Sequence, residues 1–212
     1  MKLIIFDIDG VLNKQELLVK TRKEAQLKAV ADKLNINMDE ADKKYEEAKE
    51  KLSPDKRHTS VNIITNLGFT REEYFKIIDS VDPTGLIKIT DNCKEMLEEI
   101  KNNVIIAYSN TPRTALVKTL KVLGIDKYFK KVYSVEDFDE SKPSVNNLKK
   151  ILKKEDFKAK DAVFIGNSLE KDIIPPHKLG IKTILFDSIG RYKNAKEADF
   201  IIKDLIEIVD IV

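Results

Sequence analysis

The second part of the sequence alternates short strand-like runs with segments of helical periodicity, and this alternation constrains the fold more than any other feature. The expected strands cover 104–108, 131–133, 162–165, 183–186 and 200–202. The expected helices between them cover 91–102, 112–123 and 144–153. Strands that are apolar without polar alternation, and that are separated by helices, indicate a parallel sheet covered on both faces. The sequence therefore predicts an α/β fold with a doubly wound parallel sheet.

A further apolar run begins the chain and ends abruptly in Asp7-Ile8-Asp9-Gly10. Successive side chains of a strand point to opposite faces, so Asp7 and Asp9 are expected on the same side where this strand ends. Two carboxylates that close cannot both ionise cheaply, so either one keeps its proton or a cation lies between them. Asp and Gly are also common turn formers, and this run alone leaves catalysis and a plain turn equally open.

Residues 14 to about 82 carry no convincing strand, and their apolar residues recur at helical spacing. Turn residues at 35–37, 53–55 and Gly68 separate the expected helices. We expect an all-helical cap domain at 14–83 and a core domain formed by 1–13 and 84–212. The cap is then inserted at the carboxyl edge of the sheet, where open α/β folds bind ligands, and it is placed like a lid.

The composition narrows the classes of protein that this chain can represent. Its 212 residues are 42% hydrophobic and 35% charged, with 38 Lys and Arg against 36 Asp and Glu, which predicts a globular protein without a nucleic-acid partner. One cysteine allows neither an intrachain disulfide nor a thiolate zinc site, and Cys93 falls on an apolar helical stripe that favours core packing. No segment is long and apolar enough for a membrane span, so we expect a cytoplasmic protein.

Polar side chains follow several of the expected strands at what the parallel topology makes a single edge. Asp7 and Asp9 follow the first strand, 109–111 follow the next, and 166–168 with Asp172 follow a third. Lys142 lies in the loop after the short strand at 131–133; a solvated surface lysine is the plainer interpretation of that residue. Carboxylates, a hydroxyl, backbone N–H groups and an ammonium are together suited to a metal-bound phosphoryl group.

Four motifs at these strand ends resemble those of the haloacid dehalogenase superfamily of aspartate-nucleophile phosphohydrolases. They are Asp7-Ile8-Asp9-Gly10-Val11, Tyr108-Ser109-Asn110, Lys142-Pro143, and Gly166-Asn167-Ser168 through Asp172. Each is weak alone, but four in this order are specific, and the resemblance covers nearly the whole chain. It implies a Rossmann-like core with a helical cap. It also implies a Mg²⁺-dependent phosphatase of a small phosphorylated metabolite, active as a monomer or small homo-oligomer.

The resemblance implies a role for each motif residue. Asp7 would attack phosphorus and form an aspartyl phosphate, and Asp9 would protonate the leaving oxygen and then activate water. Ser109 and the backbone N–H of Asn110 would hold phosphoryl oxygens. Lys142 would offset the negative charge between nucleophile and phosphate.

The resemblance also implies a magnesium site formed by Asp7, Asp9 through its backbone carbonyl, Asp172 and Asn167. The superfamily usually has an acid at the position of Asn167, and an amide there removes one negative charge and is expected to weaken metal affinity. Two consecutive prolines, 175 and 176, are also unusual in this motif. The next helix is expected to start near them and to leave Asp172 in a loop.

Several alternatives remain open from the sequence. Asp9 argues against the dehalogenase activity, because a halide leaves without a proton and the dehalogenases lack this acid. The stretches 57–88 and 109–113 look more like the pyrimidine 5′-nucleotidase or phosphoglycolate phosphatase branches. A phosphomutase would use the same two aspartates, and a non-catalytic binding protein for a phosphorylated ligand is supported only by Asn167. His58 is expected in a polar loop of the cap, and a place for it at the site is the less favoured of its two interpretations, whereas His177 is expected in solvent.

Overall fold

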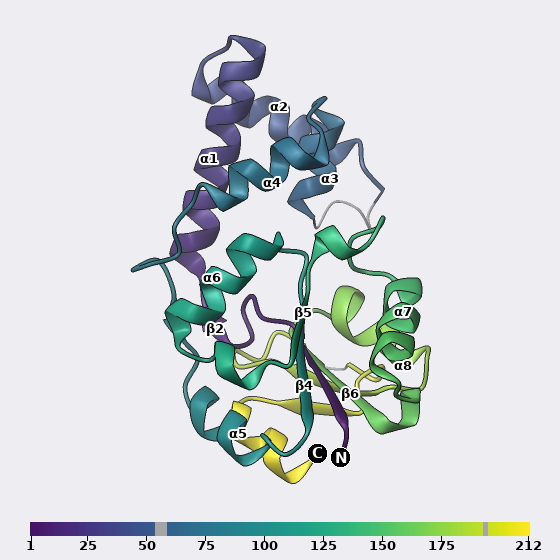
Figure 1. The fold of residues 1–212 in the computed structure, drawn as a ribbon. Coiled ribbons are helices and arrows are strands. Elements are labelled where there is room, and N and C mark those ends of the chain that lie inside the picture. The colour runs from purple at the N-terminus through teal and green to yellow at the C-terminus, as the bar shows by residue number, and fades with distance from the viewer. Residues whose placement is uncertain (54–58, 193–194) are drawn as a thin grey trace. The chain divides into compact units, whose positions relative to one another are not determined.

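The structure is a computed structural model that describes residues 1–53, 59–192 and 195–212. It divides into two compact units, one formed by Met1–Lys14 and Ile87–Val212, the other by Gln15–Leu86. Figure 1 shows the first as a sheet with helices and the second as helices alone. His58 and most of the predicted break at 53–55 lie outside the described residues.

The larger unit is built on a six-stranded sheet in the order β5-β4-β1-β6-β7-β8, and all neighbouring strands are parallel, as predicted. The strands are β1 (Leu3–Phe6), β4 (Val104–Tyr108), β5 (Lys131–Tyr133), β6 (Ala162–Gly166), β7 (Lys182–Phe186) and β8 (Phe200–Ile202). β1 is completely buried because it pairs with β4 on one side and β6 on the other. The chain therefore reverses its winding direction next to β1, which is the place where such sheets bind ligands.

Helices cover both faces of this sheet, which explains why its central strands are apolar without alternation. The helices are α5 (Cys93–Glu99), α6 (Arg113–Leu123), α7 (Val145–Glu155) and α8 (Ile174–His177). Figure 1 shows α5 and α6 on one side of the sheet and α7 and α8 on the other. Leu148 and Ile151 of α7 and Leu3 and Ile5 of β1 belong to one buried hydrophobic cluster. Short 3-10 turns complete the unit at Asp126–Tyr128, Val135–Asp137, Ala159–Asp161 and Leu205–Asp210.

The described residues of the smaller unit form helices joined by turns, with no strand among them. Its helices are α1 (Glu16–Leu34), α2 (Met38–Glu50), α3 (Ser60–Asn66) and α4 (Arg71–Asp79). The predicted break at 35–37 separates α1 from α2: Asn35 takes a left-handed conformation with φ 53°, and the Asn37 side chain accepts a hydrogen bond from Glu40 N as the N-cap of α2. The helical spacing of Met38, Ala41, Tyr45, Ala48 and Leu52 predicts one apolar face. Ala41, Tyr45 and Ala48 are buried, whereas Met38, at the first position of α2, is 44% exposed.

Two local predictions were wrong. Lys14 was expected in a strand-free segment, but β2 (Asn13–Lys14) pairs antiparallel with β3 (Lys88–Ile89), and strands of two residues have no periodicity to detect. Asp172 was expected in a loop, but it lies in a π-helical turn, Leu169–Ile173, that leads directly into α8. Ser168 starts this turn, because its hydroxyl accepts from Lys171 N and its carbonyl accepts from Asp172 N.

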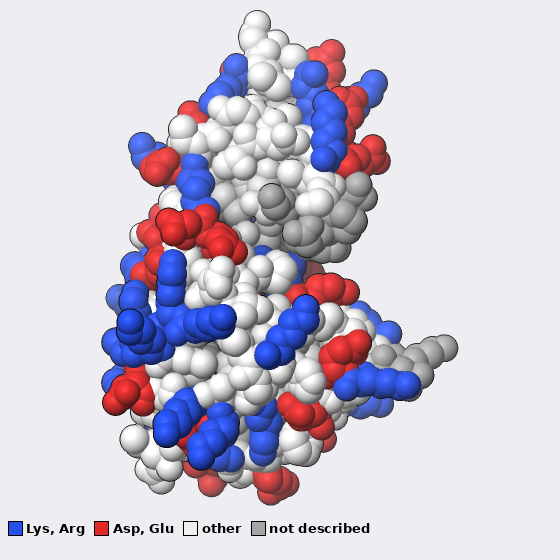
Figure 2. Space-filling view, turned by 90° about the vertical axis from the view of Figure 1, so that its right-hand side faces the viewer, with Lys and Arg blue, Asp and Glu red and all other residues white. Residues whose placement is uncertain are grey.

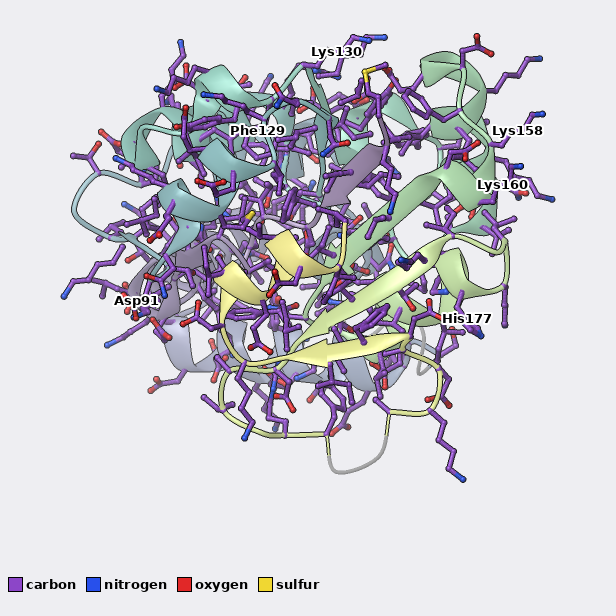
Figure 3. All side chains as sticks on the ribbon, turned by 90° about the horizontal axis from the view of Figure 1, so that it is seen from below. Asp91, Phe129, Lys130, Lys158, Lys160 and His177 are labelled. Atoms are coloured by element: carbon purple, nitrogen blue, oxygen red, sulfur yellow. The ribbon has the colours of Figure 1, made fainter. Side chains whose placement is uncertain are left out.

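The two remaining candidate residues that the structure describes, Cys93 and His177, form no second site. Figure 2 shows side chains of both charges, Lys and Arg as well as Asp and Glu, spread over the face in view. Cys93 is buried, and burial raises the pKa of its thiol to about 12. The side chain of His177 is 49% exposed at the end of α8 and lies at the rim of the molecule in Figure 3. No helix in the described part of the chain is long and apolar enough to cross a membrane.

Candidate active site

The carboxyl ends of β1, β4 and β6 bring the motif residues of the core unit to one edge of the sheet. The backbone continues the strand pairing slightly beyond the strands, with Asp7 N donating to Ile165 O at 2.8 Å and Ser109 N donating to Tyr133 O at 3.0 Å. These bonds fix where Asp7 and Ser109 leave the sheet.

Lys142 lies at the centre of the cluster rather than in solvent, with its side chain only 3% exposed. Its Nζ atom is 2.8 Å from Asp7 Oδ1 and 2.9 Å from Asp172 Oδ1, and it donates to the Tyr108 carbonyl at 3.1 Å. An ammonium has three donors, so these three acceptors use all of them. Burial opposes the charge of the ammonium, but the carboxylates of Asp172 and Asp7 outweigh it and raise the pKa of Lys142.

The pKa of the Asp7 carboxyl group is raised well above its usual value. Burial is the largest cause that raises its pKa, from 3.8 to about 7, and the charge of Asp172 adds to it while Lys142 opposes it. Asp9 contributes less than Asp172 to this shift. The like charge that matters most for Asp7 therefore comes from Asp172 of the fourth motif, and not from its neighbour in the sequence.

Asp9 is held by two hydroxyl groups on one of its oxygens. Its Oδ2 atom accepts hydrogen bonds from Thr111 Oγ1 at 2.6 Å and from Ser109 Oγ at 3.1 Å. Its Oδ1 atom is buried and has no hydrogen-bond partner. The sequence placed Thr111 at this edge of the sheet with the rest of 109–111, but gave it no role. Extending the strand period of two past the end of β4 would have placed it beside Ser109.

Asn110 contacts the backbone of Lys142, with its Oδ1 accepting from Lys142 N at 2.6 Å and its Nδ2 donating to Lys142 O at 3.1 Å. These two hydrogen bonds hold the Asn110 side chain against the loop that carries Lys142. The role predicted for Asn110 involves its backbone N–H and not this side chain.

Asn167 and Ser168 of the fourth motif form hydrogen bonds with Asp9 and Asp172. Asp172 Oδ2 accepts from Ser168 N at 3.2 Å, and Asn167 Nδ2 donates to the backbone carbonyl of Asp9 at 3.3 Å. Position 166 has room only for glycine, because a Cβ atom there would lie 2.2 Å from the Cβ atom of Asp172. Arg191, another residue that the sequence did not indicate, donates from Nη2 to the carbonyl of Asn167 at 3.1 Å.

The site offers oxygen ligands that suit a hard cation, namely the carboxylates of Asp7 and Asp172 and the carbonyl of Asp9. Within the described residues, no three His, Cys, Asp or Glu side chains are already arranged around a common metal position. The Lys142 ammonium contacts two carboxylates, those of Asp7 and Asp172, so this buried cluster holds one positive charge against two negative charges. The residues present therefore fit magnesium in donor type and in charge.

The fold and the site define a class of protein, the α/β proteins with a parallel sheet that carry a cluster of carboxylates around one buried ammonium at the carboxyl end of the central strand. The family profile of the haloacid dehalogenase-like hydrolases matches residues 4–186, and the chain belongs to this family. The resemblance that the motifs predicted is thereby confirmed.

Individual proteins agree with this assignment. The chain is similar to the glyceraldehyde 3-phosphate phosphatase of Methanocaldococcus jannaschii, with 28% identity over 100% of this chain and 97% of that protein. It is also 28% identical to the ribulose-1,5-bisphosphate 5-phosphatase of Halopiger xanaduensis, over 59% of this chain and 57% of that protein.

The fold itself is shared with the crystal structure of a HAD phosphatase from Thermococcus onnurineus. That likeness has a TM-score of 0.77 and 21% identity, and it covers 100% of this chain and 97% of the other. The protein is thus a phosphatase of the haloacid dehalogenase superfamily with a Rossmann-like core, as predicted.

Proposed function

We propose that the protein hydrolyses a small phosphorylated metabolite in a magnesium-dependent reaction, with Asp7 carrying the phosphoryl group between two displacements. The observation that supports this most is the buried arrangement of Asp7 and Asp172 on the ammonium of Lys142. The two curated relatives described above are named for small phosphorylated carbohydrates, which supports a substrate of this size for the present chain.

In the first displacement, a carboxylate oxygen of Asp7 forms a bond to phosphorus while the bond between phosphorus and the ester oxygen breaks. The electron pair of that bond stays on the ester oxygen, which takes a proton from the carboxylic acid of Asp9 and leaves as an alcohol. Asp9 is thereby left as a carboxylate. Lys142 offsets the charge that accumulates between Asp7 and the phosphoryl oxygens.

In the second displacement, a water molecule attacks the phosphorus of the aspartyl phosphate. Asp9 accepts a proton from this water, the bond between phosphorus and Asp7 breaks, and inorganic phosphate leaves. Both aspartates are then restored. Ser109 and the backbone N–H of Asn110 hold the phosphoryl oxygens in both displacements.

Asp7, Asp172 and the carbonyl of Asp9 would hold the magnesium ion, with Asn167 beside them. When bound there, magnesium supplies the positive charge that keeps Asp7 ionised and offsets the charge of the phosphoryl oxygens.

The test measures phosphate release from a panel of phosphate esters with and without magnesium, for the wild type and for Asp7→Asn. We expect release that requires magnesium and is lost in the variant, and we expect acid quenching to trap phosphate on the wild-type chain only. Asp139→Asn is the matched control, because the Asp139 side chain is 97% exposed and should leave activity unchanged. Wild-type protein that releases no phosphate with any divalent metal would contradict the proposal.

A further inference from the structure

We propose that Thr111 is a positioning residue that orients Asp9 for proton transfer to the leaving group. The inference rests on the proposed function, in which Asp9 is the general acid. It starts from the short bond of 2.6 Å that the Thr111 hydroxyl donates to Asp9 Oδ2, the same oxygen that receives the Ser109 hydroxyl at 3.1 Å.

Ser109 and Thr111 differ in the other hydrogen bonds that their hydroxyl groups have to make. The Ser109 hydroxyl has one proton, which it gives to Asp9, while its oxygen accepts the backbone N–H of Thr111 at 3.0 Å. When Ser109 turns its proton toward a phosphoryl oxygen of the substrate, Asp9 loses that donor. The Thr111 hydroxyl then remains as the donor that holds Asp9.

The two oxygens of Asp9 are thereby distinguished. Both hydroxyl groups bind Oδ2, whereas Oδ1 is buried without a partner. A buried oxygen that lacks a partner is costly, and a proton carried on it toward a substrate oxygen would satisfy it. By fixing Oδ2, Thr111 keeps the carboxyl group in the one orientation that leaves Oδ1 for the reaction.

The backbone around Thr111 suits a fixed donor. Thr111 is buried and lies between the end of β4 and Pro112, which is the N-cap of α6. The φ angle of a proline is fixed by its ring, and the Pro112 carbonyl accepts from Leu116 N at 2.8 Å at the start of the helix. The Thr111 hydroxyl is therefore attached to a backbone segment that cannot turn freely.

The test compares Thr111→Val, which keeps the shape and removes the hydroxyl, with Thr111→Ser, which keeps the hydroxyl. Both are assayed with magnesium on 4-nitrophenyl phosphate, whose leaving group needs no proton, and on glycerol phosphate, whose leaving group does. The parameter compared is kcat/KM, because it reports the steps up to transfer of the phosphoryl group to Asp7 and excludes the later hydrolysis. Asp9→Asn defines the effect of losing the acid altogether.

We expect Thr111→Val to lower kcat/KM for glycerol phosphate about 10- to 100-fold and to change the value for 4-nitrophenyl phosphate much less. Thr111→Ser should recover most of the loss, and the KM for both esters should stay near that of the wild type. Circular dichroism checks folding, and Thr111→Ala is a second variant without the hydroxyl that should show the same dependence on the leaving group.

Equal losses on both esters, or a Thr111→Ser variant as impaired as Thr111→Val, would overturn the inference while leaving the proposed function in place. The proposed function itself would fail, and this inference with it, if the wild type released phosphate from no ester of the panel with any divalent metal. An Asp9→Asn variant without dependence on the leaving group would remove Asp9 as the acid and would overturn the inference too.

Discussion

The side chain of Asn110 binds the backbone of Lys142 at both of its polar groups, accepting from the N–H at 2.6 Å and donating to the carbonyl at 3.1 Å. The orientation of the amide is unambiguous, because a backbone N–H only donates and a carbonyl only accepts. Asn110 comes from the loop after β4 and Lys142 from the loop before α7, so this pair joins two strand-end loops. It fixes the backbone from which the Lys142 ammonium reaches Asp7 and Asp172.

Asn110→Ala should therefore weaken both catalysis and folding. Loss of two partly buried hydrogen bonds should lower the free energy of unfolding by about 1–3 kcal/mol, and a displaced Lys142 should lower kcat about tenfold or more. Urea denaturation and steady-state kinetics measure the two effects. Asn146→Ala, on the exposed side of α7, is the matched control. An unchanged kcat in Asn110→Ala would show that Lys142 does not need this support.

Asn167→Asp should separate the stability of the metal-free protein from its magnesium affinity. A carboxylate cannot donate to the Asp9 carbonyl as Asn167 Nδ2 does at 3.3 Å, and it adds negative charge beside Asp7 and Asp172, so the metal-free variant should melt at a lower temperature. The same added charge should tighten magnesium binding about tenfold. Thermal melting with and without magnesium, together with calorimetric titration, tests both effects. Unchanged magnesium affinity would show that position 167 does not contribute to the metal site.

The stability of the metal-free protein should depend on pH through Asp7. The pKa of this group is raised from 3.8 to about 7, so the folded state binds the proton more tightly than the unfolded state does. The resulting stabilisation of the folded state is fully present below about pH 4. This contribution is lost as the pH rises through about 7. Melting temperatures measured between pH 4 and pH 8 in a chelator should fall more steeply for the wild type than for Asp7→Asn, which has no proton to lose. Parallel curves for the two proteins would contradict the assignment.

Gly166→Ala should damage the site through Asp172. The added Cβ would lie 2.2 Å from Asp172 Cβ, so one of the two residues must move, at a cost of about 1–3 kcal/mol or more, and Asp172 would leave its position on Lys142. We expect a lower melting temperature and a large loss of kcat.

Gly166→Ala introduced into the Asp172→Gly variant provides the control, because that variant has no Cβ atom at position 172 for the new side chain to clash with. There the additional loss of stability should be small. Equal destabilisation in both backgrounds would place the clash elsewhere.

The pattern of the sequence was sufficient to predict the parallel sheet and the family. Unalternated apolar strands between helices are a local property, and so is a carboxylate at the end of such a strand; together they indicated the parallel sheet and the haloacid dehalogenase motifs. The sequence could not indicate β2 and β3, because each two-residue strand depends on a partner far away in the chain, as in the pair of Asn13 and Ile89, which are 76 residues apart. Nor could it place Asp172 in a π-helical turn, which depends on bonds around Ser168.

The sequence by itself determined which chemical groups reach the carboxyl edge, because strand ends in a parallel sheet meet there whatever the details of packing. Only the tertiary structure decided how those groups are paired. It buries Lys142 on Asp7 and Asp172, turns Asn110 to the lysine backbone, and places Thr111 on Asp9. The physical reason is that pairing, burial and pKa depend on distances between residues far apart in the chain. The two aspartates of the first motif are thus distinguished by their neighbours from other loops and not by their place in the sequence.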